Sequence, residues 1–69
     1  MDEIDRLWKQ YEDFKETAEQ YMFPAILVFD KQLVPAYRDL QEYYTAGHAI
    51  TFKHALLGCM RYLGIEAEE

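Results

Sequence analysis

The 69-residue chain has few of the residues on which loops, disulfides and many catalytic sites depend. It contains no serine and no asparagine, three glycines, two prolines and one cysteine, Cys59. Few residues therefore favour turns or disordered segments, and no serine nucleophile exists. A single cysteine excludes an intrachain disulfide, and with it the class of small secreted proteins that disulfides stabilise.

Long apolar segments are also missing. No run of about 18 apolar residues occurs, which is the length that a membrane-spanning helix needs. The chain starts with Met-Asp-Glu-Ile-Asp, the reverse of a cationic signal peptide, and shows no lipidation motif. We therefore expect no membrane segment, no export and a cytoplasmic location, which is the cytoplasm of the host cell if a phage encodes the chain.

Positive charge is scarce. The chain has 13 acidic residues against seven lysines and arginines, which gives a formal net charge of −6. Such a charge repels phosphates, so we expect no direct binding of nucleic acid. The distribution is uneven, because residues 1–23 carry seven acidic residues and residues 43–65 carry none.

Hydrophobic residues are abundant. They make up 51% of the chain and include one tryptophan, six tyrosines and four phenylalanines. These side chains suffice for one core, but so short a chain buries only about 60% of the surface that its unfolded form exposes. We expect a marginally stable monomer, to which a partner or self-association contributes stability.

The spacing of the apolar residues predicts a first amphipathic helix, which starts near Asp2 and ends or kinks at Phe23-Pro24. Acidic residues in its first turn suit the positive end of the helix dipole. Its predicted apolar stripe consists of Ile4, Leu7, Tyr11, Phe14, Ala18 and Tyr21.

A second apolar stripe runs through residues 24–46 and passes Pro35 without a change of phase. It predicts one helix kinked at Pro35 or two nearly collinear helices, with Gly47 at the end. Ile, Leu, Val and Phe in a short run also fit a buried strand. A small α+β fold that pairs residues 25–29 with residues 49–53 is therefore the alternative.

Thr51 is predicted to cap a third helix, and Gly64 with Ile65 resembles a Schellman stop. The predicted fold is all-α, a small three-helix bundle with a Pro-kinked central helix. It forms a single helical domain over residues 1–65, followed by a frayed acidic tail over residues 66–69. The core stripe predicted for the third helix consists of Phe52, Ala55, Leu56, Cys59, Met60 and Leu63.

Two sets of side chains are candidates for a protein-binding surface. Acidic residues lie opposite the apolar stripe of the first helix, either as a solvated face or as a ridge that docks on a basic surface. Apolar residues off the main stripes belong either to the core or to an exposed patch that a partner covers. The candidate protein-binding residues are Asp5, Glu12, Asp13, Glu16, Glu19, Leu27, Val34 and Leu57.

The sequence predicts no catalytic, cofactor-binding or metal-binding residue. His54 and Cys59 are five residues apart and point away from each other on one helix, and His48 lies in a predicted loop, so no zinc or di-iron spacing is present. Cys59 is expected to be a small buried hydrophobe. The three glycines are isolated, so no phosphate-binding loop exists and we do not expect an enzyme.

These features predict a binding module that acts stoichiometrically on a protein partner with a basic surface. They fit an inhibitor of a nucleic-acid-handling protein, of the kind that phages and mobile elements direct against CRISPR effectors. In that case the carboxylates stand in for phosphates, as in a DNA mimic. The alternative is a homo-oligomeric structural, adaptor or assembly protein, such as a phage assembly chaperone.

Overall fold

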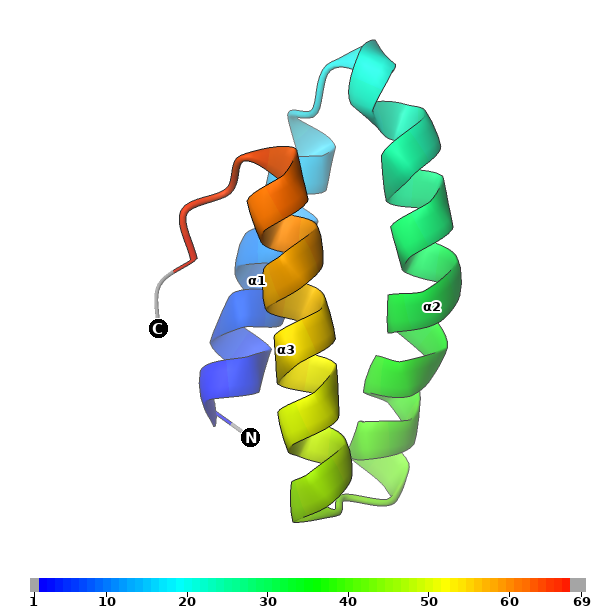
Figure 1. Ribbon diagram of the computed structural model, residues 1–69, viewed down its shortest axis with the longest axis vertical. Coiled ribbons are helices and arrows are strands. Elements are labelled where there is room, and N and C mark those ends of the chain that lie inside the picture. Colours follow the sequence, from blue (N-terminus) through cyan, green and yellow to red (C-terminus); the bar gives the residue numbers. More distant parts are fainter. Residues whose placement is uncertain (1, 68–69) are drawn as a thin grey trace.

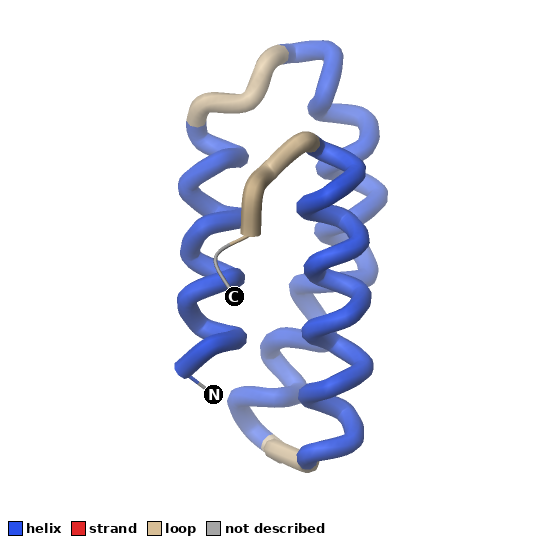
Figure 2. The backbone as a smooth tube through the Cα atoms, turned by 60° about the vertical axis from the view of Figure 1, so that its left-hand side comes forward, coloured by secondary structure: helices blue, strands red, loops and turns tan. Residues whose placement is uncertain are grey.

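Three consecutive helices form an antiparallel bundle (Figure 1). The computed structural model describes residues 2–67, with helices α1 (Asp2–Glu16), α2 (Phe23–Glu42) and α3 (Ala46–Leu63), and a short 3-10 helix η1 (Gln20–Met22) before α2. Short loops join the helices, and residues 2–67 contain no strand (Figure 2). The predicted all-α three-helix bundle is therefore confirmed, and the α+β alternative is wrong.

The core is formed by one stripe from each helix. The buried residues are spaced by three, four or seven positions, as expected for helices that are amphipathic. They are Ile4, Leu7 and Tyr11 of α1, Ile26, Leu33 and Leu40 of α2, and Ala49, Phe52, Leu56, Met60 and Leu63 of α3. Two members of the stripe predicted for the third helix differ, because Ala55 is exposed and Cys59 is half-buried.

The first helix is shorter than predicted. It ends at Glu16, where the amide and the hydroxyl of Thr17 both donate to the carbonyl of Phe14, at 3.1 and 3.3 Å. Tyr21, predicted to continue the apolar stripe, lies in η1 and is 77% exposed. Pro24 belongs to the first turn of α2, where a missing amide hydrogen costs no hydrogen bond. The proline therefore starts the second helix and does not end the first.

The central helix is continuous through Pro35. Of the two predicted arrangements, the structure therefore has the single helix and not two collinear helices. Its ribbon curves with the convex side away from the other two helices (Figure 1), as expected when a proline lies on the solvent side. The helix ends at Glu42, and the amide of Tyr43 donates to the carbonyl of Asp39 at 2.7 Å. The prediction that Gly47 ends this helix is wrong.

The cap of α3 is Thr45, and the prediction of Thr51 is wrong. The Thr45 hydroxyl oxygen accepts a hydrogen bond from the amide of His48 at 3.2 Å. Thr51 lies inside the helix and donates its hydroxyl to the carbonyl of Gly47 at 3.1 Å. His48, predicted in a loop, is therefore in the first turn of α3.

The end of α3 matches the prediction. Gly64 has a φ of 84°, its amide donates to the carbonyl of Arg61 at 3.1 Å, and the amide of Ile65 donates to the carbonyl of Met60 at 2.9 Å. These two bonds define a Schellman motif.

The C-terminal segment after α3 turns back along the bundle. Ile65 and Ala67 are half-buried against the core, and the side-chain amide of Gln10 donates to the carbonyl of Glu66. The first half of the predicted acidic tail is therefore docked, and Glu68 and Glu69 lie outside the described residues.

Candidate protein-binding surface

Asp30 defines the edge at which α2 meets α1. Its carboxylate accepts hydrogen bonds from the Tyr11 hydroxyl at 2.6 Å and from Lys15 Nζ at 3.1 and 3.2 Å. The Lys15 ammonium lies 3.0 Å from Glu12 Oε1 and 4.9 Å from the centre of the Tyr11 ring. Burial and the neighbouring Asp30 raise the pKa of Tyr11 far above its usual value. The Tyr11 hydroxyl therefore remains a donor, and this buried polar group is satisfied.

Tyr37 makes a second contact along the same edge. Its ring stacks on Trp8, with centroids 4.5 Å apart and planes at 17°. Its hydroxyl donates to Asp5 at 2.7 Å, and burial together with that carboxylate raises the pKa of Tyr37 to about 12. Tyr37 follows Asp30 by seven residues, or two helical turns, so both contacts mark one edge of α2.

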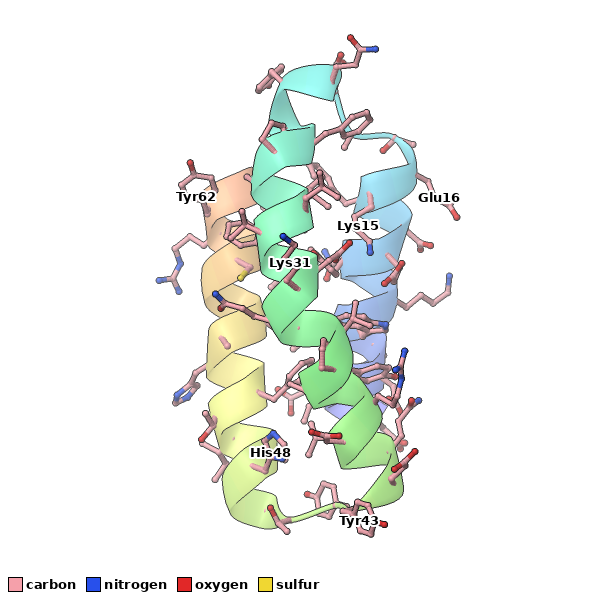
Figure 3. All side chains as sticks on the ribbon, turned by 90° about the vertical axis from the view of Figure 1, so that its right-hand side faces the viewer. Lys15, Glu16, Lys31, Tyr43, His48 and Tyr62 are labelled. Carbon is pink, nitrogen blue, oxygen red and sulfur yellow. The ribbon has the colours of Figure 1, made fainter. Side chains whose placement is uncertain are left out.

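Leu27 and Val34 extend this edge towards solvent. Leu27 precedes Asp30 by three residues, and Val34 precedes Tyr37 by three residues. Each therefore lies about one helical turn from one of these two contacts. Leu27 is 64% exposed and Val34 is half-buried. On α1, Glu12 faces the same edge through Lys15, which lies between α1 and α2 in Figure 3. Glu16 follows Glu12 by one turn and projects from the outer side of α1, at the rim of this edge (Figure 3). Together these side chains form the acidic-apolar face, which consists of Asp5, Glu12, Glu16, Leu27 and Val34.

The other three predicted binding residues lie outside this face. Glu19 is exposed in the loop between α1 and η1, because α1 ends at Glu16. Asp13 pairs with Lys9 at 3.1 Å on another side of α1. Leu57 of α3 is half-buried and helps to line a pocket of about 230 Å³ beneath the C-terminal segment. The structure thus brings five of the eight predicted residues together.

Nearby cations and donors partly compensate the carboxylates of the acidic-apolar face. Asp5 accepts from Tyr37, Glu12 pairs with Lys15, and Lys31 projects from the exposed side of α2 (Figure 3). Glu16 has no ion-pair partner among residues 2–67. The face therefore combines apolar area with a moderate negative charge and is not a continuous carboxylate ridge.

The structure also exposes large apolar side chains outside the eight predicted binding residues. Tyr62 of α3 is 74% exposed near Tyr21, at the end of the bundle where α1 connects to α2. At the opposite end, Tyr44 and Ile50 border a pocket of about 370 Å³. Helical periodicity places Tyr62 and Ile50 off the core stripe of α3, but it does not show whether another helix covers them.

Residues 2–67 offer little for cofactor chemistry. No three His, Cys, Asp or Glu side chains in this part of the chain converge as metal ligands do. Burial raises the pKa of the half-buried Cys59 thiol, which favours the unreactive protonated form.

No helix within the described range has the length and apolar composition that crossing a membrane requires. No protein-family model matches the chain, and no curated protein or solved structure is significantly similar to it. Its function therefore has to be inferred from its own surface.

Proposed function

We propose that this chain is an acidic protein-binding module that acts stoichiometrically and docks its acidic-apolar face on a basic surface of a larger protein. The observation that carries the proposal is the exposure of Leu27 within a helix, beside the acidic edge of α1. Covering a leucine side chain is worth about 1.5–3 kcal/mol, and the monomer does not gain it here. A partner that covers Leu27 gains that free energy.

The charge of the chain favours a basic partner. The net charge of −6 attracts cationic surfaces over a distance of about 10 Å at moderate salt. Lysine and arginine of the partner then meet Glu16 and the partly compensated Glu12 at the rim of the apolar contact. Rim charges of this kind raise the association rate and select the partner more than they add affinity.

Proteins that handle nucleic acids offer such basic surfaces, because they neutralise phosphates with lysine and arginine. A carboxylate-bearing module on such a surface excludes the nucleic acid from it. Inhibition or antagonism of a nucleic-acid-handling protein is therefore the mode of action that we propose. The predicted absence of catalytic groups is compatible with a module that acts one to one.

The test compares two double variants, each of which replaces one exposed aliphatic and one exposed acidic residue and changes the net charge by the same amount. Leu27→Arg with Glu16→Lys alters the acidic-apolar face, whereas Ile50→Arg with Asp13→Lys alters exposed positions elsewhere. A protein captured from the native host with the intact chain is then titrated with each variant. We expect the first variant to bind at least about tenfold more weakly, which corresponds to about 1.4 kcal/mol, and the second to bind like the native chain.

Two further results decide the proposal. Nucleic acid added to the captured protein should compete with the native chain, and lack of competition would argue against inhibition at a phosphate-binding surface. Equal binding by both double variants, or failure to capture any protein, would reject the acidic-apolar face as the docking surface. Circular dichroism of both variants verifies that the helices are retained.

A further inference from the structure

The edge at which α1 meets α2 carries three rows of side chains, and the two members of each row are seven residues apart. Seven residues are nearly two helical turns, so the members of a row lie one above the other, about 10.5 Å apart. The acidic row on α1, the apolar row on α2 and the basic row on α2 are Asp5 and Glu12, Leu27 and Val34, and Lys31 and Arg38, respectively.

The contacts between the two helices bring the rows to matching heights. At the first level, Asp5 accepts a hydrogen bond from the Tyr37 hydroxyl at 2.7 Å. Val34 precedes Tyr37 by three residues and Arg38 follows it directly, so both lie within one turn of this contact. One carboxylate, one aliphatic side chain and one guanidinium group therefore share this level.

The second level repeats the first. Glu12 Oε1 lies 3.0 Å from Lys15 Nζ, which in turn lies 3.1 Å from Asp30 Oδ1 of α2. Leu27 precedes Asp30 by three residues and Lys31 follows it directly, so both lie within one turn of this contact. The same three kinds of group, acidic, apolar and basic, therefore meet again.

The apolar row lies between the other two rows. At about 100° per residue, Leu27 is about 60° and Lys31 about 100° round α2 from Asp30, which contacts α1. Figure 3 shows Lys31 on the outer side of α2, and Lys15 between α2 and α1. A segment that covers the apolar row therefore has carboxylates along one flank and cations along the other.

The basic row is available to a partner. Lys31 and Arg38 are both exposed, and neither forms an ion pair with another residue of the range 2–67. Leu27 is 64% exposed beside them. A partner that covers Leu27 thus also meets two cations that the bundle itself does not neutralise.

The spacing of the rows distinguishes between the backbone conformations that could cover them. In a helix, positions seven apart lie on one face about 10.5 Å apart, which is the spacing of the rows. In an extended strand, side chains on one face recur every ~6.6 Å, and neither one nor two such steps reach that distance. Apolar positions flanked by charges are also the arrangement by which helices pair in coiled coils.

We propose that the part of the partner that docks here is an amphipathic helix with opposite charges on its two flanks, an inference that rests on the proposed function. Its apolar residues, seven positions apart, cover the apolar row. Lysine or arginine lies on its flank next to the acidic row, and aspartate or glutamate on its flank next to the basic row. This helix becomes the fourth of the bundle, and a helix that is basic on both flanks is disfavoured by the basic row.

Two synthetic helical peptides of identical composition serve as probes, with apolar residues seven positions apart. The first carries lysine along one flank and glutamate along the other, and in the second lysine and glutamate alternate along both flanks. A helix can lie in either direction, so the first peptide can always place its lysines next to the acidic row. We expect it to bind the native chain at least about tenfold more tightly than the second, as measured by fluorescence anisotropy at concentrations where the peptides are monomeric.

Reversal of the basic row tests the second flank. Lys31→Glu with Arg38→Glu should weaken binding of the first peptide at least about tenfold, and should favour a third peptide with lysine on both flanks. Arg6→Glu with Arg61→Glu is the matched control, because it changes the net charge equally at exposed positions of α1 and α3. The control should bind all three peptides like the native chain, and circular dichroism verifies that both variants keep their helices.

Equal binding of the first two peptides, or an unchanged preference after reversal of the basic row, would overturn the proposal. If neither peptide binds, although a captured host protein binds the native chain and not the double variant at Leu27 and Glu16, the helix is wrong and the proposed function stands. Binding of the first peptide without capture of any host protein would reject the proposed function alone. A native chain that dimerises below about 1 mM in sedimentation equilibrium, and loses the dimer on Leu27→Arg, would assign the apolar row to a second copy and overturn the proposal.

Discussion

The interface between α1 and α2 and the interfaces that α3 makes with both helices are built differently. α3 packs closely against its neighbours, and Phe52, Leu56 and Met60 on it are at most 2% exposed. α1 and α2 approach each other less closely and are bridged by long side chains, among them the Lys15–Asp30 pair. The core of the bundle is therefore organised around α3, and the α1/α2 interface depends more on polar and aromatic groups.

This difference bears on where partners bind. Because the α1/α2 bridges extend to the surface, carboxylates and exposed apolar residues such as Leu27 lie side by side at that edge. The α2/α3 interface needs no such bridges, and its outer surface exposes Val28 and Tyr62. One bundle thus offers two chemically different faces, and the following substitutions test how far the two interfaces differ.

The largest effect is expected from the packing around α3. Leu56 is completely buried, so Leu56→Ala removes apolar contacts and leaves a cavity, at a cost of about 2–5 kcal/mol. That cost is a large part of the stability of a small domain. Urea denaturation followed by circular dichroism measures it. Leu27→Ala, at an exposed position, should change stability by less than about 0.5 kcal/mol, and similar losses for both variants would contradict an α3-centred core.

A smaller loss is expected when the polar bridge between α1 and α2 is removed. Asp30→Ala leaves the buried Tyr11 hydroxyl and the Lys15 ammonium without this acceptor, which costs about 1–3 kcal/mol. Asp39→Ala removes an exposed carboxylate from the same helix and should be nearly neutral. Equal stability of the two variants would show that the polar bridge does not hold α1 against α2.

Tyr37 should make the same interface sensitive to alkaline solution. Its pKa is raised from 10.0 to about 12 in the folded chain, so the folded state holds this proton more tightly than the unfolded state. The resulting stabilisation is complete below pH 10 and is lost as the pH rises through about 12. Tyr37→Phe should cost about 0.5–1.5 kcal/mol at neutral pH and weaken this alkaline dependence, as measured by denaturation at several pH values.

The control for that experiment is Tyr43→Phe, which changes an exposed tyrosine outside the interface. It should leave both the neutral stability and the alkaline profile unchanged. If Tyr37→Phe and the native chain lose stability equally at alkaline pH, the hydrogen bond from Tyr37 to Asp5 is not the cause of that loss.

The smallest effects concern two glycines of opposite role at α3. Gly58→Ala should stabilise the monomer by roughly 0.5–1 kcal/mol, because the helix interior has open space there. Gly64→Ala should destabilise it by about 1 kcal/mol, because a φ of 84° strains any residue with a Cβ atom. Thermal denaturation at low concentration measures both. A destabilising Gly58→Ala would mean that α3 constrains this position inside the monomer.

Helix boundaries were harder to predict than the helices themselves. Pro24 fits both the end of one helix and the first turn of the next, and only the chain reversal after Glu16 separates the two. Thr45 and Thr51 are equally good caps in sequence, and Gly47 looks like a stop although it lies in the first turn of α3. Gly64 was predicted correctly because its left-handed conformation and its hydrogen bonds are local.

The candidate surface was predictable only in part. The sequence placed the acidic residues opposite the stripe of the first helix, but it could not show that Asp5 and Glu12 lie next to α2. Leu27 and Val34 were open to two interpretations, core or exposed patch, and the packing of α1 leaves Leu27 exposed and Val34 half-buried. The exposure of Tyr62 could not be predicted from the sequence, because it depends on the direction from which α2 approaches α3.

The sequence alone determined that this chain forms three amphipathic helices, because apolar spacing and the Gly64 stop act between residues only a few positions apart. Tertiary structure decided which side chains meet across the bundle, including Tyr11 with Asp30 and Glu3 with Lys53. Those partners are 19 and 50 residues apart, and their meeting depends on the order, direction and rotation of whole helices. The same arrangement, and not the local pattern, determines which side chains share the acidic-apolar face.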